Sequence, residues 1–202
     1  MKGNSFLNKM KLYLLRHFAH NGRLGAYYGS TNLPLKDLSM RPLELERALP
    51  VYSSPLLRCT QSLKHLGVND FTSLETAKEV DFGDWEGKTF EEINSLEPTK
   101  VDEWAHGENF QFPGGEKVSD FENRMKALAI TLRDVNEDLI LVSHGGVIRT
   151  LLCAFLDIEF KKSFSFKVDL GSLTCLEIFP NGGSTLNFLN NTEMQTWPTL
   201  LS

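Results

Sequence analysis

The 202-residue sequence has no excess of positive charge and no long apolar run. Its 21 lysine and arginine residues face 26 aspartate and glutamate residues, so the formal net charge is −5. Such a chain lacks the basic face that salt-dependent nucleic-acid binding needs, although a single compact pocket can still be positive. No stretch approaches the roughly 20 apolar residues of a membrane span. We therefore predict neither a nucleic-acid partner nor a membrane partner.

Cysteine is scarce as well. Cys59, Cys153 and Cys175 form no C-x-x-C pair, and an odd number of cysteines cannot close a complete set of disulfides. This pattern favours reduced thiols and a cytoplasmic protein. Residues 1–10 lack the apolar core of a signal peptide. We expect a flexible N-terminal extension over 1–10 and a single domain over 11–202, a length that suits one α/β domain.

Three widespread catalytic signatures are absent. The sequence contains no H-E-x-x-H zinc motif, no G-x-x-x-x-G-K-[ST] loop for a nucleoside triphosphate and no G-x-S-x-G nucleophile turn. We therefore predict no metal site and no cofactor, and we look for chemistry that amino-acid side chains can perform alone.

Strand patterns and helix patterns alternate along the chain. The predicted strands cover Lys11–Leu15, Val51–Ser53, Leu139–Val142 and a hairpin of Leu173–Phe179 with Thr185–Leu189. The predicted helices cover Leu38–Leu49, Ser54–Leu66 with Pro55 as first helical residue, 90–96 after a Thr89 capping box, 119–132 after a Ser119 capping box, and Val147–Leu156. This alternation predicts an α/β fold, a three-layer α/β/α sandwich around a mostly parallel sheet.

Polar residues follow three of the predicted strands, where sheets of this kind bind ligands. Arg16 and His17 follow the first strand, Arg58 lies early in the helix after the second, and His144 and Gly145 follow the strand over 139–142. Arginine forks match phosphate oxygens, a neutral imidazole can attack phosphorus, and a second, protonated imidazole can hold an oxygen. Backbone N–H groups at a helix start also favour anions. The sequence therefore predicts a site for a small phosphorylated substrate.

Other roles are less sharply marked. A proton donor for the leaving oxygen is available from an acidic stretch that holds Glu79, Asp81, Asp84 and Glu86. In the Gly-rich loop over 21–34, Asn21, Ser30 and Thr31 are candidate phosphate contacts, with a plain turn role as the alternative. We expect His20 to be an exposed loop residue, with a place in the lining of the pocket as the alternative. We expect Arg149 to be structural, with pairing to a carboxylate as the alternative.

Six motifs occur in an order that resembles a known family. They are L-L-R-H-F at 14–18, Y-G-S-T-N-L-P-L at 28–35, S-S-P-L-L-R-C-T-Q-S at 53–62, E-V-D-F-G-D-W-E-G at 79–87, P-G-G-E-K-V-S-D-F-E-N-R at 113–124 and S-H-G-G-V-I-R at 143–149. Together they resemble the histidine phosphatase superfamily, which is phosphoglycerate-mutase-like, and within it the alpha-ribazole phosphatase group. The chain departs from the pattern at Phe18, where relatives carry a small residue, and at Ala19, where many carry Glu.

The resemblance implies a phosphoglycerate-mutase-like fold and metal-independent hydrolysis through a phosphohistidine. His17 would carry the phosphoryl group, Arg16, Arg58 and His144 would hold it, and Glu79 would be the general acid. The implied substrate is alpha-ribazole 5′-phosphate, or cobalamin 5′-phosphate, in cobalamin nucleotide-loop assembly. The alternatives are a broad-specificity or sugar-phosphate phosphatase of the same fold and a non-catalytic phospholigand-binding domain. A homodimer formed through the hairpin over 173–189 is also considered.

Overall fold

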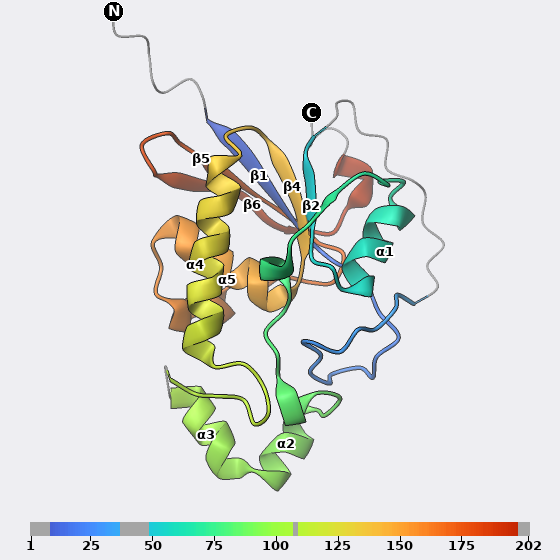
Figure 1. The fold of residues 1–202 in the computed structure, drawn as a ribbon, viewed down its shortest axis with the longest axis vertical. Helices are drawn as coiled ribbons and strands as arrows, with labels where there is room; N and C mark the ends of the chain where they lie inside the picture. The colour runs from blue at the N-terminus through green and yellow to red at the C-terminus, as the bar shows by residue number, and fades with distance from the viewer. Residues whose placement is uncertain (1–8, 37–48, 107–108, 198–202) are drawn as a thin grey trace, which may run out of the picture.

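The computed structural model describes residues 9–36, 49–106 and 109–197, which form a sheet between helical layers (Figure 1). The strands are β1 (Met10–Arg16), β2 (Val51–Ser53), β3 (Thr72–Ser73), β4 (Leu139–Ser143), β5 (Leu173–Ile178) and β6 (Ser184–Asn191). They lie in the order β3-β2-β4-β1-β5-β6. The first four strands of this order pair in parallel, and β5 and β6 continue the sheet antiparallel. The predicted α/β class is confirmed, with a mixed sheet.

Five α-helices and four 3-10 helices accompany the sheet in the described residues. They are α1 (Leu57–His65), α2 (Phe90–Leu96), α3 (Pro98–His106), α4 (Val118–Asp134), α5 (Gly145–Leu156), η1 (Glu75–Ala77), η2 (Gly83–Trp85), η3 (Phe160–Ser165) and η4 (Met194–Thr196). In Figure 1, α2 and α3 lie below the sheet, away from its strands. The sequence patterns did not predict α3.

Two apolar clusters lie on opposite faces of the sheet because the side chains of a strand alternate between faces. Leu12 and Leu14 of β1 belong to the cluster that α4 and α5 cover. Tyr13 and Leu15 belong to the other cluster, which includes Cys59 and Leu63 of α1. Strands buried on both faces read as continuous apolar runs, which is why the four-residue run in β4 predicted a central strand correctly. The sheet is therefore the middle of three layers.

The start of α1 lies two residues later than its predicted first residue, Pro55. Ser54 donates its N–H to the carbonyl of Val142, so the chain is still paired with the neighbouring strand at this point. The helix begins at Leu57, whose N–H donates to Oδ1 of Asn32 at 2.7 Å. A distant loop thus satisfies one of the N–H groups that every helix start leaves open.

One of the two predicted capping boxes exists. Thr89 accepts the N–H of Glu92, and the Glu92 carboxylate accepts the N–H of Thr89, so α2 begins where predicted. The box at Ser119 is wrong, because α4 begins one residue earlier, at Val118. The N–H of Val118 donates to the Phe110 carbonyl at 2.8 Å, so a tertiary hydrogen bond takes the place of a side-chain cap.

The predicted helix over 38–49 and the predicted extension over 1–10 both include residues that the structure does not describe. The helix predicted over Leu38–Leu49 falls, apart from its last residue, outside the described residues. The predicted N-terminal extension over 1–10 is too long, because Met10 is the buried first residue of β1 and Lys9 forms an ion pair with Glu177. Residues 1–8 lie outside the described residues.

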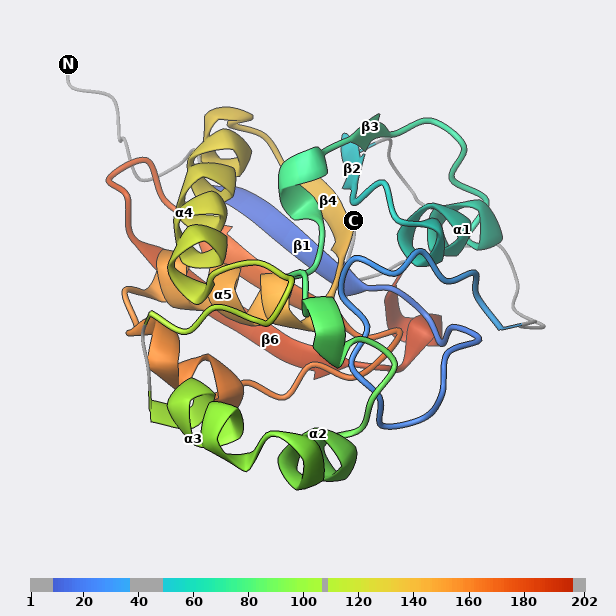
Figure 2. The same cartoon turned by 60° about the horizontal axis from the view of Figure 1, so that its bottom comes forward.

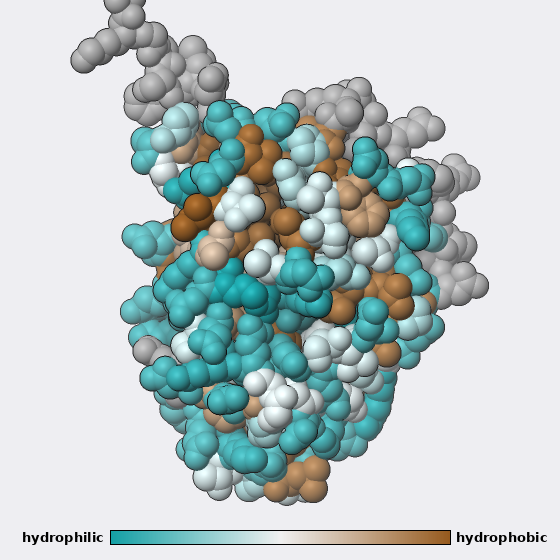
Figure 3. All heavy atoms as spheres, in the orientation of Figure 1, coloured by the Kyte–Doolittle hydropathy of each residue, from teal (hydrophilic) through white to brown (hydrophobic). Residues whose placement is uncertain are grey.

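The surface drawn in Figure 3 is mainly hydrophilic over its lower third, where α2 and α3 lie. Leu96, at the end of α2, is an exception with 68% of its surface exposed. Within the described residues, no helix is long and apolar enough to cross a membrane.

Candidate active site

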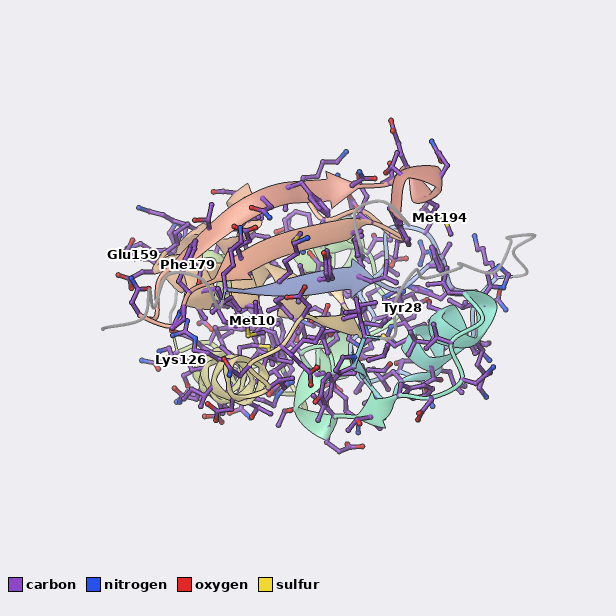
Figure 4. All side chains as sticks on the ribbon, turned by 90° about the horizontal axis from the view of Figure 1, so that it is seen from above. Met10, Tyr28, Lys126, Glu159, Phe179 and Met194 are labelled. Atoms are coloured by element: carbon purple, nitrogen blue, oxygen red, sulfur yellow. The ribbon has the colours of Figure 1, made fainter. Side chains whose placement is uncertain are left out.

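The predicted site residues come together because β2, β4 and β1 are parallel neighbours that end at one edge of the sheet. Arg16, the last residue of β1, is in register with Ser143, the last residue of β4. The next residue, His17, donates its N–H to the Ser143 carbonyl, so the pairing continues past the strand end. Figure 4 shows β1 starting at Met10 and pointing toward the region of Tyr28, in the loop that covers this edge.

His17 is buried, with 3% of its surface exposed. Its Nδ1 lies 2.7 Å from the carbonyl oxygen of Phe18. Because a carbonyl can only accept, Nδ1 carries the proton and Nε2 keeps a lone pair. Burial, followed by the charge of Arg58, holds the pKa of His17 well below its ordinary value. The side chain is therefore a neutral imidazole that can act as a nucleophile.

His144 is also buried and lies beside His17, with ring centroids 5.2 Å apart. Nε of Arg58 donates to Nδ1 of His144 at 3.1 Å, so the proton of the imidazole is on Nε2, which faces Oγ of Ser54 at 2.8 Å. Burial, followed by the positive charge of Arg58, holds the pKa of His144 well below its ordinary value. The expected protonated second imidazole is thus neutral here, because burial and the neighbouring Arg58 both disfavour its charged form.

Arg58 is fully buried and makes three hydrogen bonds. Besides the bond to His144, its Nη1 donates to the Thr31 carbonyl at 2.8 Å and its Nη2 to the Gly29 carbonyl at 2.7 Å. A guanidinium has five N–H groups, so one N–H on each terminal nitrogen is left for a ligand. Burial lowers the pKa of Arg58 from its ordinary value, whereas the charge of Glu79 raises it. The residue remains a cation at neutral pH.

Arg16 offers a buried donor that has no partner. Its Nη1 donates to the Val168 carbonyl at 2.6 Å, while its Nε is buried without a hydrogen-bond partner among the described residues. A Cβ on Gly145 would lie only 3.2 Å from Cζ of Arg16, so a glycine lets the guanidinium lie across the start of α5. Unpaired buried donors are rare in proteins, and one beside a helix N-terminus suits an anionic ligand.

Glu79 is the acid that the structure brings to this edge. Its Oε2 accepts the N–H of Gly146 at 2.8 Å, and its Oε1 accepts the N–H of Val80 at 3.1 Å. A Cβ on Gly146 would overlap the Glu79 carboxylate, since it would lie 2.4 Å from Oε1. Burial lowers the pKa of both Arg16 and Arg58, and the charge of Glu79 opposes that shift, as expected for a carboxylate near the two guanidinium groups.

The three other acids that the sequence left open have different partners. Asp81 accepts the N–H of Gly83 and the hydroxyl of Ser30. Asp84 is exposed and lies beside Gly114. Within the described part of the chain, Glu86 accepts hydrogen bonds only from residues 29–31. Glu79 is therefore the one of the four with a contact to the start of α5.

The candidate phosphate contacts in the 21–34 loop have other positions. Asn21 is exposed, and its backbone N–H donates a hydrogen bond to the Pro34 carbonyl. Both the N–H and the hydroxyl of Ser30 donate to Glu86, and so do those of Thr31. Neither residue therefore has a free donor for a phosphate, which argues against the predicted contact.

Sequence reasoning missed two residues that border the site. His20 was expected to be exposed, but it is half-buried, its ring centroid is 5.6 Å from that of His17, and burial lowers its pKa. Arg149 has the structural contact that we expected, since its Nε donates to the Phe166 carbonyl, and its Nη1 also lies near the start of α5, 3.3 Å from where a Cβ on Gly145 would lie. The signal was present, because side chains four residues apart share a helix face and point toward its N-terminus.

The assembled residues can bind a tetrahedral dianion next to a nucleophile. We call Arg16, His17, Arg58 and His144 the phosphate cluster and residues 79–86, which include Glu79, the acid segment. The phosphate cluster supplies positive charge and a neutral imidazole, and the acid segment supplies a carboxyl group. Within the described ranges, no group of three or more His, Cys, Asp and Glu side chains is arranged to hold a metal ion.

Comparisons with known proteins identify the family to which this fold belongs. The family model of the histidine phosphatase superfamily (branch 1) matches residues 12–192. Phosphoserine phosphatase 1 of Hydrogenobacter thermophilus is 29% identical over 185 residues, covering 84% of this chain and 87% of its own.

Two solved structures have the same fold. The phosphoserine phosphatase of Entamoeba histolytica, solved with 3-phosphoglyceric acid, is 26% identical with a TM-score of 0.75, over 92% of this chain and 98% of its own. The alpha-ribazole phosphatase of Shigella flexneri is 22% identical with a TM-score of 0.75, over 91% of this chain and 97% of its own. At that identity the second comparison shows the fold alone.

Proposed function

The chain belongs to the histidine phosphatase superfamily (branch 1) and is a phosphoric monoester hydrolase, and from this premise we propose that it works without a metal, through a phosphohistidine on His17. The observation that carries the mechanism is the hydrogen bond between Nδ1 of His17 and the Phe18 carbonyl. That bond fixes the tautomer and leaves the lone pair on Nε2, in a cluster whose arginines can hold the phosphoryl oxygens.

In the first step, Nε2 of His17 attacks phosphorus and forms a P–N bond while the P–O bond to the leaving alcohol breaks. The carboxyl group of Glu79, in its protonated form, gives its proton to the leaving oxygen. Arg16, Arg58 and the N–H groups at the start of α5 stabilise the charge on the transferring group. Phosphoryl transfer asks mainly for such positioning and charge stabilisation.

In the second step, water attacks the phosphohistidine. The Glu79 carboxylate takes a proton from the water as the new P–O bond forms and the P–N bond breaks. Inorganic phosphate leaves, and both Glu79 and His17 return to their starting protonation states. The same carboxyl group thus acts as acid and then as base.

The experiment is to trap the intermediate. A 32P-labelled phosphomonoester mixed with the enzyme and quenched should label the protein in a form that is stable to base and labile to acid, and His17→Ala should abolish both labelling and turnover. His106→Ala is the matched control, because His106 is exposed and lies on α3. Turnover by the His17 variant, or loss of wild-type turnover with a chelator, would contradict the mechanism.

We propose alpha-ribazole 5′-phosphate, or the related cobalamin 5′-phosphate, as the substrate. The support is the resemblance of the six sequence motifs to the alpha-ribazole phosphatase group. A carboxylate-bearing ester such as phosphoserine is the second candidate. It is favoured by Arg149, whose guanidinium lies beside that of Arg16 and forms no ion pair among the described residues, and by the names of the relatives.

A screen separates these candidates. It compares kcat/KM for alpha-ribazole 5′-phosphate, phosphoserine, sugar phosphates and 4-nitrophenyl phosphate. A clear maximum at the first or second compound assigns the substrate, a flat profile indicates a broad-specificity phosphatase, and no turnover of any compound supports a phospholigand-binding domain.

A further inference from the structure

The Glu86 carboxylate is half-buried and accepts hydrogen bonds from three consecutive residues, Gly29, Ser30 and Thr31, which we call the 29–31 loop. Its Oε1 accepts the N–H of Gly29 at 3.0 Å, the N–H of Ser30 at 2.5 Å and the hydroxyl of Ser30 at 3.0 Å. Its Oε2 accepts the N–H of Thr31 at 2.8 Å and the hydroxyl of Thr31. Among the described residues, no lysine, arginine or histidine forms an ion pair with Glu86. Successive N–H groups that converge on one anion are a backbone nest.

The opposite side of the 29–31 loop faces the phosphate cluster. The N–H groups of the loop point to Glu86, while the carbonyls of Gly29 and Thr31 accept the two terminal nitrogens of Arg58 at 2.7 and 2.8 Å. Figure 2 shows the loop over 17–36 passing between α1 and the segment that precedes α2. Arg58 belongs to α1, and Glu86 belongs to the segment before α2. The loop therefore connects a carboxylate to a buried guanidinium.

Close packing holds the loop in this position. A Cβ on Gly29 would lie 1.7 Å from the carbonyl oxygen of Val80, so only a glycine permits the approach. The hydroxyl of Ser30 also donates to Asp81 at 2.9 Å. Because Val80 and Asp81 directly follow Glu79, the loop fixes the phosphate cluster and the acid segment relative to each other.

Arg58 needs such support because it is a fully buried cation next to Arg16 and two neutral imidazoles. A buried charge is costly unless other groups compensate it. A carboxylate that accepts the N–H groups of a loop polarises its peptides, and polarised carbonyls bind a cation more strongly. We propose that Glu86 is a positioning residue that acts through the 29–31 loop to orient Arg58 for the phosphate of the substrate.

This inference rests on the proposed function, because it assigns Arg58 to the phosphate. Glu86→Gln replaces one accepting oxygen by an NH₂ group that faces N–H donors. We expect kcat/KM for 4-nitrophenyl phosphate and the affinity for orthovanadate to fall together by about 10- to 100-fold, since small misplacements of a catalytic group have effects of that size. Glu86→Asp, which keeps the charge, should recover part of the loss.

The matched control is Glu92→Gln. Glu92 also accepts a backbone N–H, from Thr89, and it is bound by Arg23 of the same long loop, but none of its contacts leads to Arg58. We expect this variant to stay within about twofold of the wild type, as is usual for surface substitutions. Equal effects of the two substitutions would contradict the inference.

A double-mutant cycle separates positioning from general loss of structure. If Glu86 acts through Arg58, Glu86→Gln should change kcat/KM of an Arg58→Ala enzyme by less than about twofold. The reason is that the effects of substitutions within one network of contacts do not add. Fully additive effects would overturn the inference. Should Glu86→Gln fail to fold, Thr31→Val, which removes one donor to Glu86, provides the same cycle.

The result also separates the two proposals. A wild-type enzyme that turns over no phosphomonoester contradicts the proposed function. An active wild type with an additive cycle contradicts only the role of Glu86.

Discussion

The phosphate cluster and the acid segment face the same site but are held in place in different ways. In the cluster, Arg16 ends β1, His17 follows it, and both are fixed by the register of β1 with β4. The acid segment contains no β-strand, and Glu79 is held by the N–H of Gly146 and by loop contacts. Strand register is rigid, whereas loops vary freely on a fixed scaffold. We infer that phosphate binding is common to this fold and that the choice of leaving group lies in the loops.

The largest expected effect comes from breaking the phosphate cluster. Arg16→Ala removes the guanidinium whose Nε has no protein partner. We expect kcat/KM to fall by about a hundred- to a thousandfold, the loss typical of an electrostatic donor to a transition state. The loss should be the same for every phosphomonoester, because the contact is to the shared phosphate.

The measurement is kcat/KM over a series of esters whose leaving groups differ in pKa. Arg133→Ala is the control, since Arg133 lies at the end of α4 against Phe155. A loss that varied strongly with the leaving group would show that Arg16 acts on the leaving group and not on the phosphate.

In the acid segment, the loss of activity should depend on the leaving group. Glu79→Gln removes the proton donor, so alkyl phosphates should slow by about a hundredfold or more, in the range of general acid catalysis. Aryl phosphates leave without protonation and should slow in the first step by much less. The slope of log kcat/KM against the pKa of the leaving group should steepen in the variant.

Asp81→Asn and Asp84→Asn provide the comparison, because both acids were candidates from the sequence and neither contacts α5. A steeper slope in either of these variants, with an unchanged slope in Glu79→Gln, would move the acid to that residue.

The same contrast explains what the sequence could predict. Arg16 ends β1, His17 and His144 directly follow β1 and β4, and Arg58 lies in the first turn of α1. Periodicity and the strand-end rule were therefore enough to bring Arg16, His17 and His144 together. The roles of Ser30 and Thr31 were not predictable in this way. Their partner, Glu86, is more than 50 residues away along the chain, and only the fold brings the two segments into contact.

Helix starts show the same limit. Thr89 and Glu92 form a local capping box, and α2 began as predicted. The starts of α1 and α4 depend on Asn32 and on the Phe110 carbonyl, which are distant in sequence or belong to the backbone. A helix start that depends on residues within one turn could be predicted from the sequence. A helix start that depends on hydrogen bonds from other segments could not.

Burial of two histidines in the phosphate cluster predicts a stability that depends on pH. The pKa values of His17 and His144 are held well below 6.5 in the folded protein, mainly by burial. Below pH 6.5 the unfolded chain therefore binds protons that the folded protein does not. Stability should fall with decreasing pH by up to about 1.4 kcal/mol per pH unit for each histidine.

Urea unfolding at pH 7.5, 6 and 5 measures this dependence. His144→Gln, which cannot be protonated, should flatten it, while His106→Ala should leave it unchanged because His106 is exposed. An unchanged dependence in His144→Gln would contradict the predicted contribution of His144.

The smallest expected effect concerns Arg149 of α5, whose guanidinium lies near that of Arg16. Its Nε donates to the Phe166 carbonyl at 3.1 Å, and its Nη1 would lie 3.3 Å from a Cβ on Gly145, close to Arg16. If a carboxylate of the leaving group binds there, Arg149→Met should lower kcat/KM for phosphoserine by about tenfold, as for an exposed charge-assisted bond, and leave 4-nitrophenyl phosphate within about twofold. Arg149→Lys, which keeps the charge, should lose less. Equal losses for both substrates in Arg149→Met would assign the residue to the phosphate cluster or to packing, and specificity would then have to come from the loops alone.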